Sequence, residues 1–203
     1  MTYSLNTLNA SAAAKSPPRT GAARFGHEIA LVVGLLALVF WLLALVSYSA
    51  QDAAWSTSGA RDARSVANWA GRFGAWLADG SYFALGFSVW WCVAAGVRAW
   101  LSSLARWMRG GEVVAGAASP LVRRATFWGG LVVLMCSSTA LEWSRLYRFE
   151  SFLPGHAGGV LGYLVGPAGV KWLGFTGSGL LAIVLAVACL LYTSPSPRDK
   201  RQS

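Results

Sequence analysis

The sequence predicts an all-α, polytopic integral membrane protein with four transmembrane helices and two exposed outer loops. Residues 29–47 form a run of nineteen without a charge or a proline. As a helix this run is ~28 Å long, which matches the hydrocarbon core of a bilayer. It also lacks the polar stripe that a soluble core helix shows. Only 12% of the chain is charged and 55% is hydrophobic, a composition far from that of soluble domains.

The chain before this run, residues 1–25, is predicted to be a disordered cytoplasmic tail. It is rich in Ala, Ser, Asn and Pro and has too few large apolar residues to bury a core. A cleaved signal peptide is the alternative. We favour a retained first helix, because the apolar run is longer than a signal h-region and begins well after the first residue.

The four-helix transmembrane domain is predicted to occupy residues 26–192. Its crossings are expected at about 29–47, 75–100, 125–141 and 173–192. Asp79 and Arg98 fall near the two ends of the second crossing, where each side chain can reach the headgroup region. Helical spacing of apolar residues predicts surface helices around 66–77 and at the start of 101–124.

A glycine-rich segment, residues 155–170, precedes the fourth crossing. Gly158, Gly162 and Gly166 recur every four residues, which on a helix makes a smooth ridge for close helix packing or for a subunit contact. Pro167 disfavours a regular helix at the same place. A packed helix and a re-entrant or irregular segment therefore both remain open.

No catalytic, cofactor-binding or metal-binding site is predicted. The chain has no phosphate-binding loop with its lysine, no nucleophile elbow and no zinc-binding histidine pair. Its three cysteines lie in three different apolar runs, and its two histidines lie near expected membrane edges. We therefore expect no enzyme activity from these residues.

The basic residues predict the orientation in the membrane. An even number of crossings places both ends of the chain on one side. Eleven of the lysines and arginines fall on that side and six on the other, so the positive-inside rule places both termini in the cytoplasm. The outer loops, residues 48–75 and 142–159, then face away from the cytoplasm.

Four sequence pieces are familiar in their order and spacing. They are YSAQDAAWS at 48–56, NWAGRFGAWLAD at 68–79, LPGHAGGVLG at 153–162 and GFTGSGLL at 174–181. With these pieces the chain resembles, over about residues 24–192, the N-terminal four-helix membrane domain of FtsK/SpoIIIE-type DNA translocases in its proteobacterial form. Residues 193–203 do not resemble the family's continuation and are interpreted as a polar tail of foreign or mis-assembled origin.

The resemblance implies a function. In that family this domain anchors the protein in the inner membrane at the division septum and contacts other division proteins. A linker then leads to a hexameric, ATP-driven DNA motor, which this sequence does not contain. The resemblance thus implies a membrane anchor that binds lipid and division proteins and self-associates, with DNA and ATP engaged only through the missing motor.

The outer loops supply the candidate contacts with partners. These candidates are Asp52, Trp55, Arg145 and Arg148. A small transporter or channel subunit is one alternative, but the expected crossings offer only a few Ser and Thr side chains as polar groups. A stand-alone membrane scaffold is the other alternative.

Overall fold

In the computed structural model the described residues are 21–56, 66–108 and 120–193. They form five α-helices and two 3₁₀ helices, without any strand in these ranges. In chain order the elements are α2 (Gly21–Val46), α3 (Gly71–Leu85), η1 (Gly86–Ser88), α4 (Val89–Met108), α5 (Pro120–Arg145), η2 (Tyr147–Phe152) and α6 (Gly159–Thr193).

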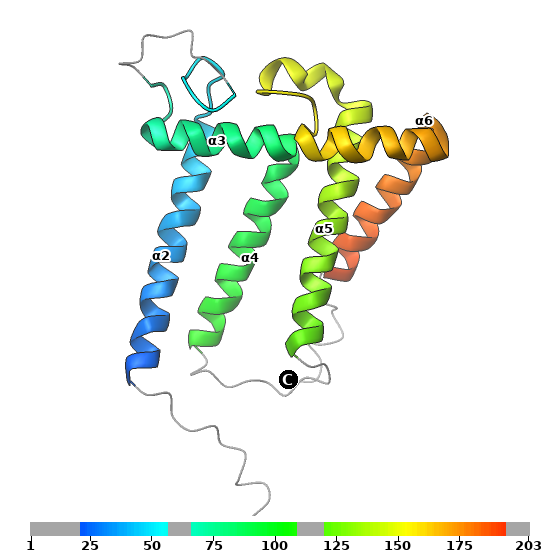
Figure 1. Ribbon diagram of the computed structural model, residues 1–203. Coiled ribbons are helices and arrows are strands. Elements are labelled where there is room, and N and C mark those ends of the chain that lie inside the picture. Colours follow the sequence, from blue (N-terminus) through cyan, green and yellow to red (C-terminus); the bar gives the residue numbers. More distant parts are fainter. Residues whose placement is uncertain (1–20, 57–65, 109–119, 194–203) are drawn as a thin grey trace, which may run out of the picture.

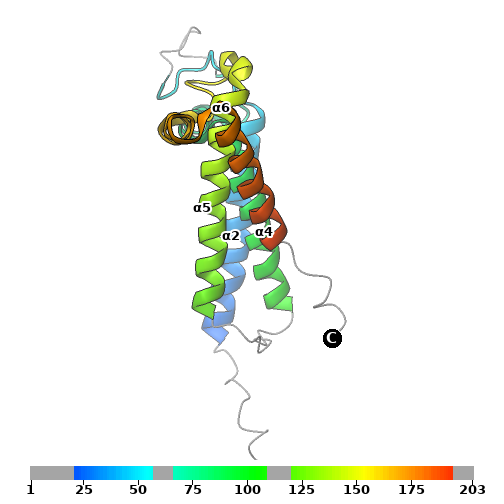
Figure 2. The same cartoon turned by 90° about the vertical axis from the view of Figure 1, so that its right-hand side faces the viewer.

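Four long helical segments stand side by side: α2, α4, α5 and the second arm of α6, residues 174–193 (Figure 1). Seen from the side they overlap within a narrow strip (Figure 2), so they form roughly one layer. Along this layer α2 packs on α4, and α5 packs on α6. We call these four segments the upright helices.

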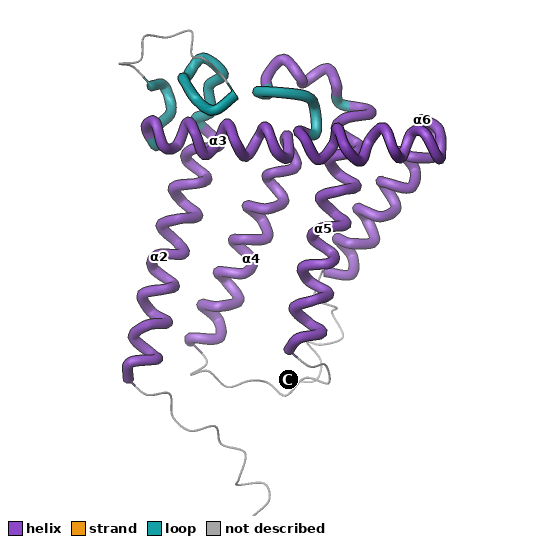
Figure 3. Tube along the Cα trace, viewed as in Figure 1, coloured by secondary structure: helices purple, strands orange, loops and turns teal. Residues whose placement is uncertain are grey.

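Two helical segments lie across one end of the upright helices. They are α3 and the first arm of α6, residues 159–173, which run nearly end to end (Figure 1). Most of the described loop residues gather at the same end (Figure 3). The two segments abut, because a Cβ on Gly159 would lie 2.6 Å from the carbonyl carbon of Ala84.

Glycines with positive φ make both changes of direction. Gly86 (φ 59°) separates α3 from α4, and Gly174 (φ 69°) separates the two arms of α6. Only glycine adopts this backbone region without strain. Pro167, by contrast, lies within the first arm of α6 without ending it.

The main buried cluster lies where α2, α3 and the start of α4 meet. It contains Ala44, Leu45, Ala78, Tyr82, Val89, Val93 and, from the loop before α6, Leu153. Large apolar side chains remain exposed along the upright helices, Val32, Leu36 and Val184 among them. Four helical stretches are long and apolar enough to cross a membrane, so lipid is the solvent that suits this surface.

The helix bounds correct several expectations. The expected crossing 75–100 is divided at η1, and the upright helix is α4. Residues 101–108, expected on the membrane surface, continue α4 instead. Hydropathy could not reveal the break, because apolar residues continue on both sides of Gly86 and the bend depends on backbone conformation.

Other bounds differ at the ends of elements. α5 is longer than the expected crossing 125–141, and α2 begins at Gly21, inside the expected disordered tail 1–25. The first surface helix, expected at 66–77, corresponds to the later and longer α3. The glycine-rich segment 155–170 is helical from Gly159 onward. Residues 1–20 and 194–203, and the expectations about them, lie outside the described residues.

Candidate functional site

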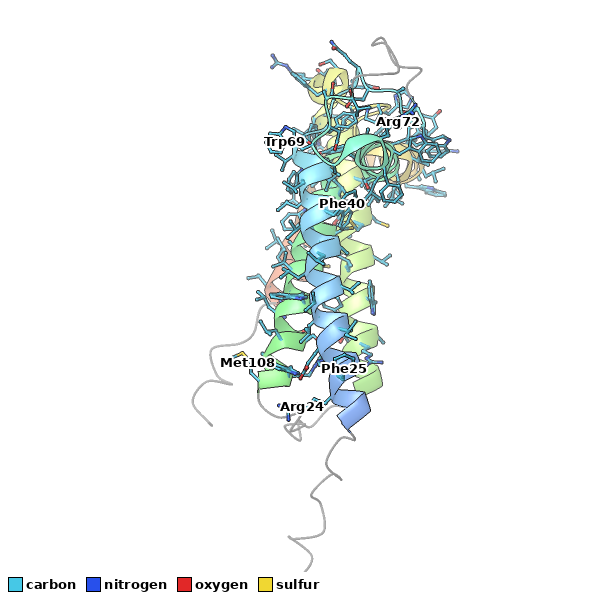
Figure 4. All side chains as sticks on the ribbon, turned by 90° about the vertical axis from the view of Figure 1, so that its left-hand side faces the viewer. Arg24, Phe25, Phe40, Trp69, Arg72 and Met108 are labelled. Carbon is cyan, nitrogen blue, oxygen red and sulfur yellow. The ribbon has the colours of Figure 1, made fainter. Side chains whose placement is uncertain are left out.

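The buried polar side chains of the described residues lie in or next to what we call the polar cap, residues 47–56, 66–88 and 146–173. Figure 4 shows the two ends of the molecule. Trp69 and Arg72 lie at the cap, whereas Arg24 and Met108 lie together at the opposite end. The first described residues of α2 and the last described residues of α6 both lie on the side away from the cap (Figure 1). An even number of crossings requires this arrangement.

A buried carboxylate closes the first loop of the cap. Asp52 is 1% exposed and accepts hydrogen bonds from the backbone N–H groups of Ala67 (2.8 Å) and Asn68 (2.9 Å). The Asn68 amide in turn donates to the carbonyl of Ala44 at the end of α2 (2.9 Å). Because a buried charge is tolerated only when it is hydrogen-bonded, these bonds hold residues 67 and 68 beside Asp52.

A second carboxylate holds the same loop on α3. Asp79 is fully buried and accepts hydrogen bonds from the backbone N–H (2.8 Å) and the hydroxyl (2.7 Å) of Ser56. The neighbouring Trp55 ring packs edge-on against Phe83, with 5.3 Å between ring centroids. Asp79 therefore anchors a loop. This corrects the expectation from the sequence that its side chain reaches the lipid headgroups.

A third carboxylate joins the two halves of the molecule. Glu142, near the end of α5, is 5% exposed and accepts hydrogen bonds from the Phe87 backbone N–H (2.8 Å) and the Ser88 hydroxyl. Ser138, one turn earlier on α5, lies 2.6 Å from the Ser88 hydroxyl and accepts a hydrogen bond from the Trp91 indole (3.1 Å). These contacts set the start of α4 beside α5.

The three predicted ridge glycines all face α5 of the same chain. Gly158, at φ 76°, precedes α6, and a Cβ there would collide with the carbonyl oxygen of Thr139. A Cβ on Gly162 would lie 2.6 Å from that same oxygen, and one on Gly166 would collide with the Trp143 ring. The ridge is therefore occupied within one chain and is not open to a second subunit.

The four candidate contact residues differ in their surroundings. Trp55 is 62% exposed, and Arg148 is exposed on η2. The Arg145 guanidinium donates to the Phe175 carbonyl (2.7 Å) and lies 3.6 Å from the centroid of its ring, so it braces the bend at Gly174. Asp52 corrects our expectation, because its carboxylate is turned inward and cannot meet a partner in this structure.

An ion pair that sequence spacing did not suggest lies at the far side of the cap. His156 Nδ1 is 2.6 Å from Glu150 Oε1, and the imidazole stacks on Tyr163 at 5.2 Å between centroids. Both side chains line an open cavity of about 350 Å³ with Tyr147 and Phe175. Among the described residues no group of three or more His, Cys, Asp or Glu is placed to hold a metal ion.

The pKa of the Tyr48 hydroxyl is shifted by its surroundings in the cap. Burial and then the nearby Asp79 carboxylate raise the pKa of Tyr48 above its usual value. A pKa that is higher in the folded state stabilises the fold below the unfolded pKa of ~10, and this contribution is lost as the pH rises further.

We therefore expect Tyr48→Phe to reduce the loss of thermal stability between about pH 9 and pH 11. At neutral pH the effect on this pH dependence should be absent, because the hydroxyl is protonated in both the folded and the unfolded protein. Melting temperatures of the detergent-solubilised protein across this pH range test the prediction. Equal alkaline losses in both proteins would contradict it.

Together these features define a class of protein: an all-α membrane domain with four spans, capped at one end by buried carboxylates. The chain belongs to the family described as the 4TM region of DNA translocase FtsK/SpoIIIE, which matches residues 23–196. This confirms both the predicted fold class and the resemblance noted in the sequence.

Curated relatives agree with this assignment. DNA translocase FtsK 2 of Ralstonia nicotianae is 35% identical over 170 residues, which cover 83% of this chain and 21% of that protein. DNA translocase FtsK 1 of Neisseria meningitidis serogroup A is 31% identical over 178 residues, covering 84% and 21%. The chain thus spans about a fifth of the length of these relatives. No solved structure matches the chain significantly.

Proposed function

We propose that this chain is the membrane anchor and assembly domain of a cell-division DNA translocase. The observation that carries the proposal is the family match over 23–196, combined with four spanning helices and a loop-bearing cap at one end. Binding of DNA and hydrolysis of ATP are then the work of the parts of the full-length relatives outside the matched fifth.

The proposed location is the bacterial inner membrane at the division septum, with both termini in the cytoplasm. Support for this orientation comes from the basic residues at the end away from the cap, which include Arg24, Arg106 and Arg124. Basic residues next to spanning helices favour the cytoplasmic side. The polar cap would then face the periplasm, where it could meet other division proteins.

Trp55 and Arg148 are the two predicted contact residues that remain available for a partner. Trp and Arg are enriched at the centres of protein interfaces, and both side chains are exposed on the cap. Self-association is also part of the proposal. Because the glycine ridge is filled by α5, self-association would use the exposed apolar sides of the upright helices.

A fluorescently tagged chain is expected to gather at mid-cell, and the double variant Trp55→Ala, Arg148→Ala should lose this enrichment while staying in the membrane. The matched control is Lys171→Ala, Trp172→Ala, which removes an exposed basic residue and a Trp that is 82% exposed from the first arm of α6. Uniform membrane fluorescence of the unaltered chain would contradict septal recruitment. Equal loss in both double variants would contradict the assignment of the contact to Trp55 and Arg148.

A further inference from the structure

A charged residue lies within one of the upright helices. Arg98 is at the middle of α4, although we had expected it at a membrane edge. Its depth follows from its neighbours on α2. A Cβ on Gly96 would lie 2.8 Å from the Leu38 side chain, and the Trp100 indole donates to the Leu31 carbonyl (2.8 Å). Arg98 therefore lies opposite about residue 34 of α2. This point is about five residues, or ~8 Å, from the start of the uncharged run 29–47.

Among residues 21–56, 66–108 and 120–193, no Asp or Glu forms an ion pair with Arg98. The two charged contacts within these ranges are Arg24–Glu28 and the Glu150–His156 pair, and neither involves this residue. A guanidinium in hydrocarbon without an anion is costly, and such residues usually mark a binding function. Arg98 is exposed on α4, and its long side chain can extend toward the headgroups of the nearer leaflet.

The side chain borders a groove between α4 and α5, the two helices that face each other at the centre of Figure 1. The groove encloses about 140 Å³. Its walls are mostly apolar, with Ala94, Ala95, Phe127, Gly130 and Leu131 among the lining residues from α4 and α5, and Cys189 and Leu190 at the end of α6 complete the lining. Arg98 is the only charged residue in this lining.

A second cation stands at the same end of the groove. Arg124 is exposed and lies three residues before Phe127 on α5, one helical turn nearer the end away from the cap. The site thus combines positive charge at its outer end with an apolar groove on the side toward the cap. That combination suits a ligand with one anionic head and a hydrocarbon tail.

We propose that this groove binds an anionic phospholipid from the leaflet at the end away from the cap. Arg98 and Arg124 hold the phosphate, which is drawn slightly inward from the headgroup plane, and an acyl chain lies along Ala94, Ala95 and Gly130. A lipid suits the site better than an acidic partner helix. The bilayer already supplies phosphates about 8 Å away, whereas a partner would have to bury its own carboxylate at the depth of Arg98.

The test is native mass spectrometry of the detergent-solubilised chain with equal amounts of palmitoyl-oleoyl phosphatidylglycerol and phosphatidylcholine. The unaltered chain should retain phosphatidylglycerol about thirtyfold better, equivalent to ~2 kcal/mol for the two basic side chains Arg98 and Arg124. Arg98→Gln should reduce this preference to about fivefold, because Arg124 remains. Arg106→Gln, an exposed arginine two turns further along α4, is the matched charge control and should keep the full preference.

A second pair of variants tests the groove without altering charge. Ala95→Phe fills the groove and should also reduce the preference, whereas Val97→Phe, on a 42% exposed position of the same helix outside the lining, should not. Equal retention of both lipids by the unaltered chain, or equal losses in Arg98→Gln and Arg106→Gln, would overturn the proposal. So would an unchanged lipid preference in Arg98→Gln accompanied by a shift in oligomer mass, which would indicate an acidic partner helix.

Discussion

Gly162→Leu is expected to destabilise the protein by about 3 kcal/mol or more, the upper range for forcing a side chain into a packed site. The reason is that a Cβ on Gly162 would lie 2.6 Å from the Thr139 carbonyl oxygen, part of the α5 backbone. A backbone atom cannot turn aside as a flexible side chain does. The first arm of α6 must therefore move away from α5.

The measurement is thermal unfolding in detergent, followed by circular dichroism and by size-exclusion chromatography. Gly129→Leu on α5 is the matched control, because a Cβ at that position meets nothing within 4 Å. The control should melt close to the unaltered chain. A Gly162→Leu protein with a normal melting temperature but a smaller oligomer would contradict this view and restore the ridge as a subunit contact.

Glu142→Ala is expected to have the second large effect, a loss of about 3 kcal/mol. The substitution removes the carboxylate partner of the half-buried Phe87 N–H and one partner of the Ser88 hydroxyl. A buried donor left unsatisfied costs ~1–3 kcal/mol, and more when the lost partner was charged. Because these bonds join η1 to α5, the loss should also loosen the contact between α4 and α5.

Two further variants make the Glu142 experiment specific. Glu142→Gln keeps acceptor oxygen at the same position and should recover part of the stability. Glu150→Ala removes an acidic residue whose ion pair with His156 is largely exposed, so it should cost at most ~1 kcal/mol. Hydrogen exchange at the amide of Phe87 should accelerate in Glu142→Ala alone. Equal effects of Glu142→Ala and Glu150→Ala would contradict the special role of the buried carboxylate.

The parts of the fold that hydropathy controls could be predicted from the sequence. All but the last residue of the run 29–47 lie within α2, and the last expected crossing, 173–192, nearly coincides with the second arm of α6. Hydropathy averages over a window, so it finds long apolar helices whatever their direction. It could not reveal that α3 and α4 meet at an angle, because Gly86 is one of twenty-three glycines and nothing local marks its positive φ.

The roles of the polar residues were harder to predict. An aspartate in a loop normally faces water, so Asp52 was expected on the surface. Its burial depends on Ala67 and Asn68, which follow fifteen or more residues later and return to it only in the folded chain. The one sequence signal was the resemblance, since Asp52, Asn68 and Asp79 all lie in the pieces that carry it. Arg98 was misplaced because its crossing was expected at 75–100, whereas α4 begins and ends about two to four helical turns later in the sequence.

The upright helices form two pairs, α2 with α4 and α5 with α6, which the carboxylate of Glu142 connects at one end. Further from the cap, the groove rather than interlocked side chains lies between α4 and α5. Contacts between the two pairs, including those of α3 with the first arm of α6, are therefore concentrated at the cap. We expect the separation of the pairs at the far end to depend on the lipid that fills the space between them.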